Sequence, residues 1–336
     1  MNKKFCLYLL ILVSFANAQQ NPKEEKLKNS SYNINAESPI FIKLNKLFLN
    51  SCPQQIHVIL TNETISKFDS STSTVFINSK ANEIEADLVH EAAHLCLEKL
   101  TKGFSNTEPF RFFDEGLANI IEAEWNSKKD DYKKKALIFA SQEARSGNIS
   151  FENIQKWNQY FGRPPRANWN AYLVGSSFIF FIQETFSDSK LNHFFKTISE
   201  NGNLEKSLLT VFGLTNIEFE KKWLHYLSKI EIPPPPKIVQ LLPAHLENGV
   251  SLTTSELTIE FDQPMNKKIS IGTKCDDGVC HTNAFWKSEK VLVIKVQGKL
   301  LPSHEYSLSL GTIHGLLQSA VGVDLPLTPW KFTTSK

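Results

Sequence analysis

The chain has 336 residues, of which 37 are Lys or Arg and 35 are Asp or Glu, so its formal net charge is +2. This near balance gives no electrostatic reason to expect a nucleic-acid partner, and 41% hydrophobic residues is typical of a folded, soluble chain. The length exceeds the usual size of one domain and favours two.

Residues 1–18 predict a secretory signal peptide. Two lysines precede an apolar run from Phe5 to Val13, and Ala16-Asn17-Ala18 forms a small-residue cleavage site. The run is too short to span a bilayer, which takes about 20 apolar residues, and no later stretch approaches that length. We expect a secreted or periplasmic protein with no integral membrane segment after cleavage. An uncleaved anchor is the alternative.

Two strands are expected before the first long helix. Gln55–Thr61 (QIHVILT) and Ser73–Ser79 (STVFINS) are rich in β-branched residues and lie between clusters of Asn, Ser and Thr. Residues 19–50, which precede them, show no firm pattern.

The stretch Glu83–Leu100 predicts a helix that carries an H-E-x-x-H motif. Residues four apart lie on one helical face, so His90 and His94 can offer two imidazole nitrogens to one metal ion. Glu91 can reach a water on that ion without being a ligand, an arrangement that suits metal-assisted hydrolysis.

A second helix is expected over Pro109–Trp125, and Glu115 lies within it. The gap after His94 is long enough to end the first helix, turn, and return an antiparallel helix to the metal. Two histidines and one glutamate leave a fourth position open, and this ligand set suits Zn²⁺ best among the available ions. The alternative for Glu115 is a carboxylate on the helix surface.

The segment Phe112–Ala118 (FFDEGLA) resembles the W-L-x-E-G-x-A-like helix of the gluzincin metallopeptidases, the thermolysin and aminopeptidase N-like clan. The resemblance implies that His90, His94 and Glu115 bind zinc, that Glu91 is the general base, and that the substrate is a peptide or protein. No segment resembles G-x-M-E-N, which anchors the substrate amino terminus in aminopeptidases of this clan, and this favours an endopeptidase.

The resemblance also implies two further roles. In gluzincins one strand of the small sheet forms the upper rim of the cleft, and we place Thr74–Asn78 there, although an ordinary strand covering the helix fits equally well. Tyr172, in Tyr172-Leu-Val-Gly175, occupies the place of a tyrosine that donates a hydrogen bond to the oxyanion in aminopeptidase-like members. The alternative is a core aromatic residue. Asn119, one turn after Glu115, is a candidate for a hydrogen bond to a ligand.

The region up to residue 230 is predicted to be mainly helical. Short breaks at residues 201–203 and 213–215 favour antiparallel packing of neighbouring helices. Arg163 and Arg166, in a proline-containing loop at 162–168, could hold a substrate carboxylate or bond to loop carbonyls. The expected helices cover residues 136–145, 150–157 and 170–186, followed by three between 189 and 230.

The run Pro233–Pro236 indicates a stiff spacer, and we place a linker at residues 231–237. Beyond it the pattern alternates, as in Leu257, Ile259 and Phe261, and turn signals recur about every ten residues, which predicts an antiparallel β-sandwich. With Phe261–Met265 (FDQPM), residues 238–336 resemble a bacterial Ig-like domain.

Four cysteines follow the leader, two in each expected domain. Cys275 and Cys280 flank an Asp-Gly turn and could form a hairpin disulfide. Cys52 and Cys96 could form a second bridge, although their separation in space cannot be read from the sequence.

The expected fold is α+β: a zincin-like catalytic domain at residues 19–230, with a small sheet and a mostly helical part, followed by an all-β Ig-like sandwich. The expected function is that of a secreted zinc metallopeptidase. The alternative is a degenerate helical scaffold in a surface-binding or adhesion protein, presented by the Ig-like domain.

Overall fold

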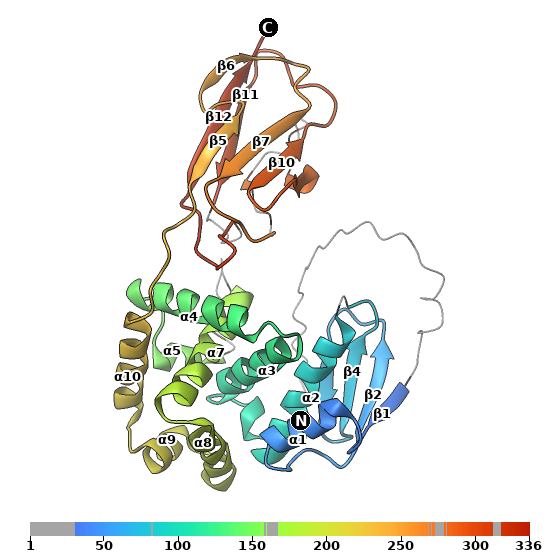
Figure 1. Cartoon of the computed structure of the whole chain (residues 1–336), viewed down its shortest axis with the longest axis vertical. Helices are drawn as coiled ribbons and strands as arrows, with labels where there is room; N and C mark the ends of the chain where they lie inside the picture. The colour runs from blue at the N-terminus through green and yellow to red at the C-terminus, as the bar shows by residue number, and fades with distance from the viewer. Residues whose placement is uncertain are drawn as a thin grey trace, which may run out of the picture.

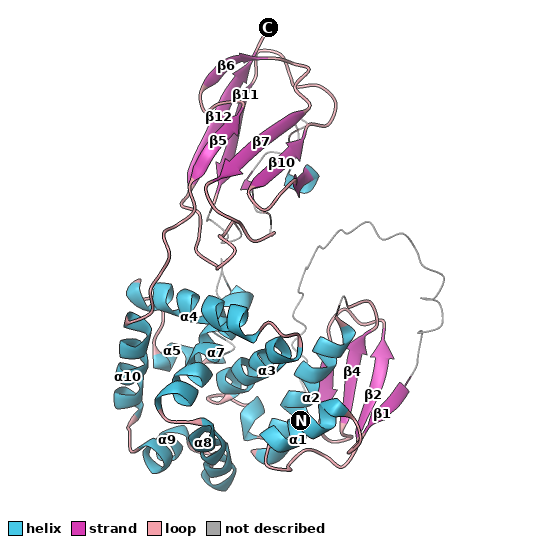
Figure 2. Ribbon diagram, in the orientation of Figure 1, coloured by secondary structure: helices cyan, strands magenta, loops and turns pink. Residues whose placement is uncertain are grey.

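The structure is a computed structural model that describes residues 31–336 except 82, 158, 160–166, 268, 270, 273–278, 280 and 312–316, together with the backbone but not the side chains of 167–170 and 281. Figures 1 and 2 show a mixed sheet and helical part followed by an all-β part. The expected signal peptide, Arg163 with Arg166, and the Cys275–Cys280 bridge lie outside the described residues.

The N-terminal sheet has four strands in the order β1-β2-β4-β3. The pair β2 and β4 is parallel, and the pairs at both edges are antiparallel. The strands are β1 (Ser31–Ile34), β2 (Ile56–Thr61), β3 (Lys67–Asp69) and β4 (Thr74–Asn78). In β2 every second side chain is buried, because neighbouring side chains point to opposite faces. The two expected strands are therefore present as β2 and β4, within one residue of their predicted ends.

The placement of Thr74–Asn78 at the rim of the cleft was wrong. This strand, β4, lies inside the sheet with β2 on one side and β3 on the other, so both edges of its backbone are paired. The edge strand is β3, which is only three residues long. Two further elements were not expected: β1 and the helix α1 (Pro39–Leu47), which contacts α2 (Ile84–Leu100).

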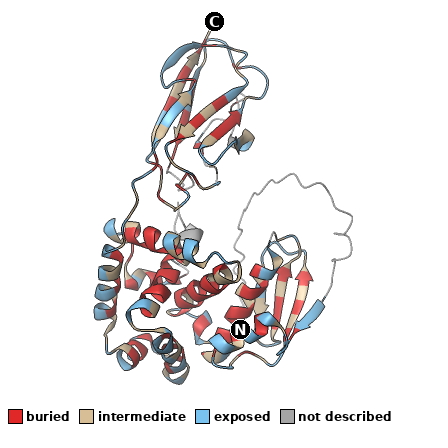
Figure 3. Ribbon diagram, in the orientation of Figure 1, coloured by how far each residue is buried: buried red, intermediate tan, exposed pale blue. Residues whose placement is uncertain are grey.

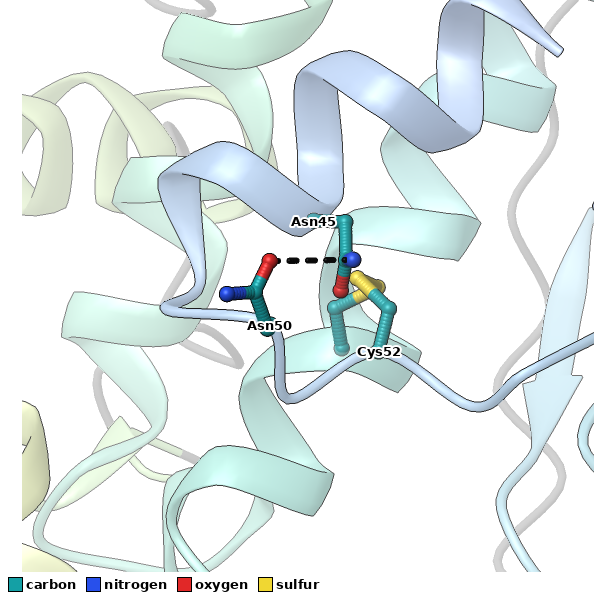
Figure 4. The surroundings of a disulfide bond; sticks show 4 residues. Asn45, Asn50 and Cys52 are labelled. Carbon is teal, nitrogen blue, oxygen red and sulfur yellow. Dashed lines mark hydrogen bonds between the residues drawn. A yellow bond between two sulfur atoms is a disulfide. The ribbon is translucent and has the colours of Figure 1, made fainter. Parts of the chain in front are cut away.

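A disulfide between Cys52 and Cys96 ties the loop before β2 to helix α2, with the two Cα atoms 4.3 Å apart. Figure 4 shows the bridge beside a turn in which Asn45 donates a hydrogen bond to Asn50. Cys96 is fully buried in the core. The two cysteines are 44 residues apart in the sequence. Closing a loop of this length lowers the entropy of the unfolded chain, which stabilises the folded state by about 4 kcal/mol.

The helical part begins with α3 (Arg111–Trp125), which packs against α2 and α7. Most residues of α2 and α3 are buried, and Figure 3 shows that other helices and the strands also carry many buried residues. Gly202 and Gly213 end α8 and α9 at the two expected breaks, with φ values of 59° and 69°. Helices often end at a residue in the left-handed conformation, and glycine adopts it without steric strain because it has no Cβ. The other helices are α4 (Lys129–Arg145), α5 (Phe151–Gln155), α7 (Ala167–Thr185), α8 (Asp188–Asn201), α9 (Leu204–Phe212) and α10 (Asn216–Ser228).

Aromatic side chains fill the core of the helical part. Phe178 in α7 stacks on Trp223 in α10 with ring centroids 3.8 Å apart, and Trp223 Nε1 donates to Ser177 Oγ at 3.2 Å. Phe112 and Phe151 also contact Phe178. Such packing anchors α3 and α7 rigidly against the rest of the domain.

The C-terminal part contains two four-stranded sheets, β5-β7-β10-β9 and β6-β12-β11-β8, around a core that includes Trp330, Tyr306 and Phe332. Among the described strands of this part, the pairs are antiparallel except β6 with β12, which is parallel, so the expectation of an antiparallel sandwich was wrong at this pair. The strands are β5 (Ile238–Leu242), β6 (Glu247–Val250), β7 (Glu256–Phe261), β8 (Ile271–Gly272), β9 (Ala284–Trp286), β10 (Val291–Lys295), β11 (Glu305–Leu310) and β12 (Thr328–Thr334).

Within the residues that the structure describes, every helix is too short or too polar to cross a membrane.

Candidate metal centre

Helices α2 and α3 bring His90, His94 and Glu115 together. One ligand atom from each of the three residues lies within 4.8 Å of the other two. The two Nε2 atoms are 3.1 Å apart, and Glu115 Oε2 lies 3.4 Å from His94 Nε2 and 3.7 Å from His90 Nε2. Tetrahedral zinc with bonds of about 2.0–2.1 Å needs ligand atoms roughly 3.3 Å apart, so this donor triangle fits the ion.

Each histidine is oriented by a carboxylate. Asp114 Oδ1 accepts a hydrogen bond from His94 Nδ1 at 2.9 Å, and Glu122 Oε2 accepts one from His90 Nδ1 at 2.9 Å. Because a carboxylate only accepts, each Nδ1 carries a proton, and each Nε2 faces the other histidine and Glu115 as the atom that can offer a lone pair to a metal. Partners of this kind fix ring orientation and raise the basicity of a metal ligand.

Asn119 does form a hydrogen bond to a candidate ligand residue, but to its backbone and not to its side chain. Its Nδ2 donates to the backbone carbonyl of Glu115 at 2.8 Å, one turn back along α3. The role falls instead to Asp114 and Glu122. Sequence reasoning missed both, although Glu122 follows Glu115 by seven residues and so returns to nearly the same helical face.

The carboxylates give the centre a strongly negative environment. Burial lowers the pKa of His94, but the charges of Asp114 and Glu115 outweigh that effect and raise it to about 9. Burial also raises the pKa of Glu91 above its ordinary value. The site therefore favours a bound positive charge. The raised pKa of Glu91 brings it closer to neutral pH than that of an ordinary glutamate, which suits a general base.

The three candidate ligands and Glu91 line one cleft of about 290 Å³. The edge strand β3 forms part of its wall, and Phe68 of that strand stacks on the His94 ring with centroids 5.5 Å apart. The lining residues are Ile65, Ser66, Lys67, Phe68, His90, Glu91, His94, Asn106, Arg111, Glu115 and Tyr172.

Tyr172 reaches the same cleft from α7. Its ring lies edge-on to Trp157 at 5.5 Å, and the side chain is half-buried. Burial, with the charge of Glu115, raises the pKa of the phenol, so the hydroxyl stays protonated and can donate. The structure thus gathers every expected site residue of the metal cleft on three helices.

Hydrogen bonds lock α7 to α3 and α4 near this residue. Ser176 Oγ lies 3.0 Å from the backbone carbonyl of Gly116 and 2.7 Å from the hydroxyl of Tyr132 in α4. Gly116 follows Glu115 directly, so the same contact steadies the candidate ligand.

Comparison with known proteins identifies the C-terminal part. Residues 233–334 match the family described as the bacterial Ig-like domain, which agrees with the two sheets of that region. The match covers less than half of the chain and extends to no residue of the metal cleft. No curated protein matches the chain.

Similarity to solved structures is low. The chain is similar to the LD transpeptidase LdtMt1 in complex with imipenem at 15% identity, over 30% of this chain and 41% of that one, with a TM-score of 0.20. It is similar to the N-terminal part of the bacterial S-layer protein SbsC at 10% identity, over 76% and 65% of the two chains, with a TM-score of 0.19. The chain spans less than two thirds of the length of these solved chains, and TM-scores this low carry no argument about function.

Proposed function

We propose that the protein is a secreted zinc-dependent metallopeptidase with a gluzincin-like catalytic domain at residues 19–230. One observation carries the proposal: two imidazole nitrogens and one carboxylate oxygen converge with tetrahedral spacing in a cleft that also holds Glu91 and Tyr172. Three protein ligands leave a fourth position for water or substrate, as a catalytic zinc site requires.

The proposed chemistry is hydrolysis of a peptide bond. His90, His94 and Glu115 would hold the zinc, which would supply Lewis acidity to a water and to the scissile carbonyl. Glu91 accepts the proton of the attacking water and passes it to the leaving amine. Tyr172 donates a hydrogen bond to the oxyanion that develops on the carbonyl oxygen.

The edge strand β3 supports an extended peptide as substrate. Among the described strands, β4 is its one partner, so the other backbone edge of Lys67–Asp69 is available beside the candidate metal centre. An extended chain can add to such an edge through main-chain hydrogen bonds. This role replaces the one assigned to Thr74–Asn78 from sequence.

Screening the purified protein against a peptide library, with and without a chelator, tests the proposal. We expect hydrolysis that the chelator abolishes and added zinc restores. The Glu91→Gln variant should bind zinc and lose hydrolysis by about 100-fold or more, because only the base is removed. Equal hydrolysis by the variant and the wild type would refute the assignment.

The match to the Ig-like family favours one other function, that of a surface-binding or adhesion protein with a degenerate helical scaffold. The same experiment separates the two. A protein that neither binds zinc nor cleaves any peptide in the library supports the binding function.

A further inference from the structure

Arg111 lies beside the candidate metal centre and contacts two of its acidic residues. Its Nη2 donates to Glu115 Oε1 at 2.5 Å, and its Nη1 lies 3.5 Å from Asp114 Oδ2. Nη1 also donates to Asn106, in the 3-10 turn Phe104–Asn106 that precedes α3. The arginine side chain is 24% exposed, whereas the side chains of Asp114 and Glu115 are 1% and 6% exposed.

The two oxygens of Glu115 have different partners. Oε1 accepts from Arg111, and Oε2 faces the Nε2 atoms of His94 and His90 at 3.4 and 3.7 Å. A carboxylate can offer a metal one oxygen or both. When Arg111 bonds to one carboxylate oxygen, only the other oxygen is left to bind the metal. Glu115 then occupies one position of a tetrahedral zinc ion, and the fourth position stays open.

Helix stability does not account for this arginine. Arg111 is the first residue of α3, where a positive charge opposes the helix dipole. In its ion pair with Glu115 the basic residue comes first in the sequence, and for residues four apart in a helix this order is less favourable than the reverse. Its contacts with Asp114 and Glu115 are therefore better explained by the cleft that it lines.

We propose that Arg111 is a positioning residue, which holds Glu115 as a one-oxygen metal ligand and steadies Asp114 against His94. One guanidinium thus joins the carboxylate ligand to the carboxylate that orients a histidine ligand. The inference rests on the proposed zinc site. Loss of such an outer partner typically weakens metal binding 10- to 100-fold.

The test compares Arg111→Met with Lys67→Met in the full-length protein. Lys67 is the matched control, because it is another cation of the same cleft but pairs with Glu63 at 2.6 Å and with no candidate ligand. Zinc affinity is measured by competition with a chromogenic chelator, and coordination by the visible spectrum of the Co²⁺-substituted protein, whose bands weaken when a fifth ligand atom binds.

We expect Arg111→Met to lose at least about tenfold in zinc affinity and to show weaker Co²⁺ bands, while Lys67→Met matches the wild type in both. If Arg111→Met binds zinc and Co²⁺ as the wild type does and changes only KM, the arginine is a substrate contact and the proposal is wrong. A wild type that binds no zinc overturns the proposed function itself, so the two failures are distinguishable.

A second variant covers the case in which Arg111→Met does not fold. Asn106→Ala removes the bond that holds the guanidinium from the side of the turn and leaves Arg111 and Glu115 in place. We expect it to weaken zinc binding severalfold with an unchanged melting temperature of the metal-free protein. Zinc affinity equal to that of the wild type in this variant would contradict the positioning role.

Discussion

Gly116 in α3 and Gly175 in α7 lie so close together that neither position has room for a side chain. A Cβ atom on Gly116 would lie 2.5 Å from the carbonyl oxygen of Gly175 and 2.7 Å from the backbone nitrogen of Ser176, and a Cβ on Gly175 would collide with the carbonyl oxygen of Phe112. The contact brings the helix that carries Tyr172 against the helix that carries Glu115.

Gly116→Ala should therefore destabilise the protein by more than about 3 kcal/mol, because the added methyl group meets backbone that cannot move aside. Urea denaturation measures the loss. Gly147→Ala is the control: its Cβ would meet nothing within 4 Å, and its φ of 68° should cost only about 1 to 2 kcal/mol. Equal losses in the two variants would mean that the helices do not cross as closely as described.

Tyr172→Phe tests the proposed oxyanion donor, since it keeps the ring and deletes only the hydroxyl. Turnover should fall about 100-fold, with zinc content and melting temperature unchanged. A core aromatic residue would behave differently, because its hydroxyl would contribute nothing to turnover. Near wild-type turnover with intact zinc would rule out the catalytic role.

Asp114→Asn should weaken zinc binding about 10- to 100-fold, because the charged acceptor that orients His94 is lost while its shape is kept. Zinc affinity is again read by chelator competition. Asn119→Ala provides the comparison on the same helix: it removes a bond to the backbone of Glu115, so we expect affinity near that of the wild type. A larger loss in Asn119→Ala than in Asp114→Asn would reverse the roles assigned here.

Reduction of the Cys52–Cys96 bridge should lower stability by up to about 4 kcal/mol, because the open chain regains the entropy of a 44-residue loop. Calorimetry with and without a reductant measures this, and Cys52→Ser should show the same loss without a reductant. Peptide mapping under non-reducing conditions should recover the two cysteines in one linked fragment. A free thiol at Cys96 would contradict the bridge.

The main helices could be predicted because their signals are local. The spacing of His90 and His94 and the apolar period of the segment around Glu115 correspond to α2 and α3 within two residues at each end. The short breaks at Gly202 and Gly213 also need only neighbouring residues to be recognised.

The features that sequence reasoning missed depend on contacts between distant segments. The edge strand Lys67–Asp69 has only three residues, too few for the alternation of apolar and polar side chains to be recognised. The longer strand β4 was therefore predicted to form the rim of the cleft. The partnership of Arg111 with Asn106 depends on where a loop and a helix meet in space. The Cys52–Cys96 bridge, by contrast, was one of the two pairs expected from the sequence, and the structure contains it. Glu122 was recoverable from helical spacing alone and was overlooked.

The proposed zinc site is best tested by the zinc content per chain, measured in parallel preparations of the wild type, Glu91→Gln and Glu115→Ala after dialysis against metal-free buffer. We expect one zinc per chain in the wild type and in Glu91→Gln, and loss of zinc in Glu115→Ala. A wild type without zinc, or a Glu115→Ala variant that keeps its full zinc and its activity, would contradict it.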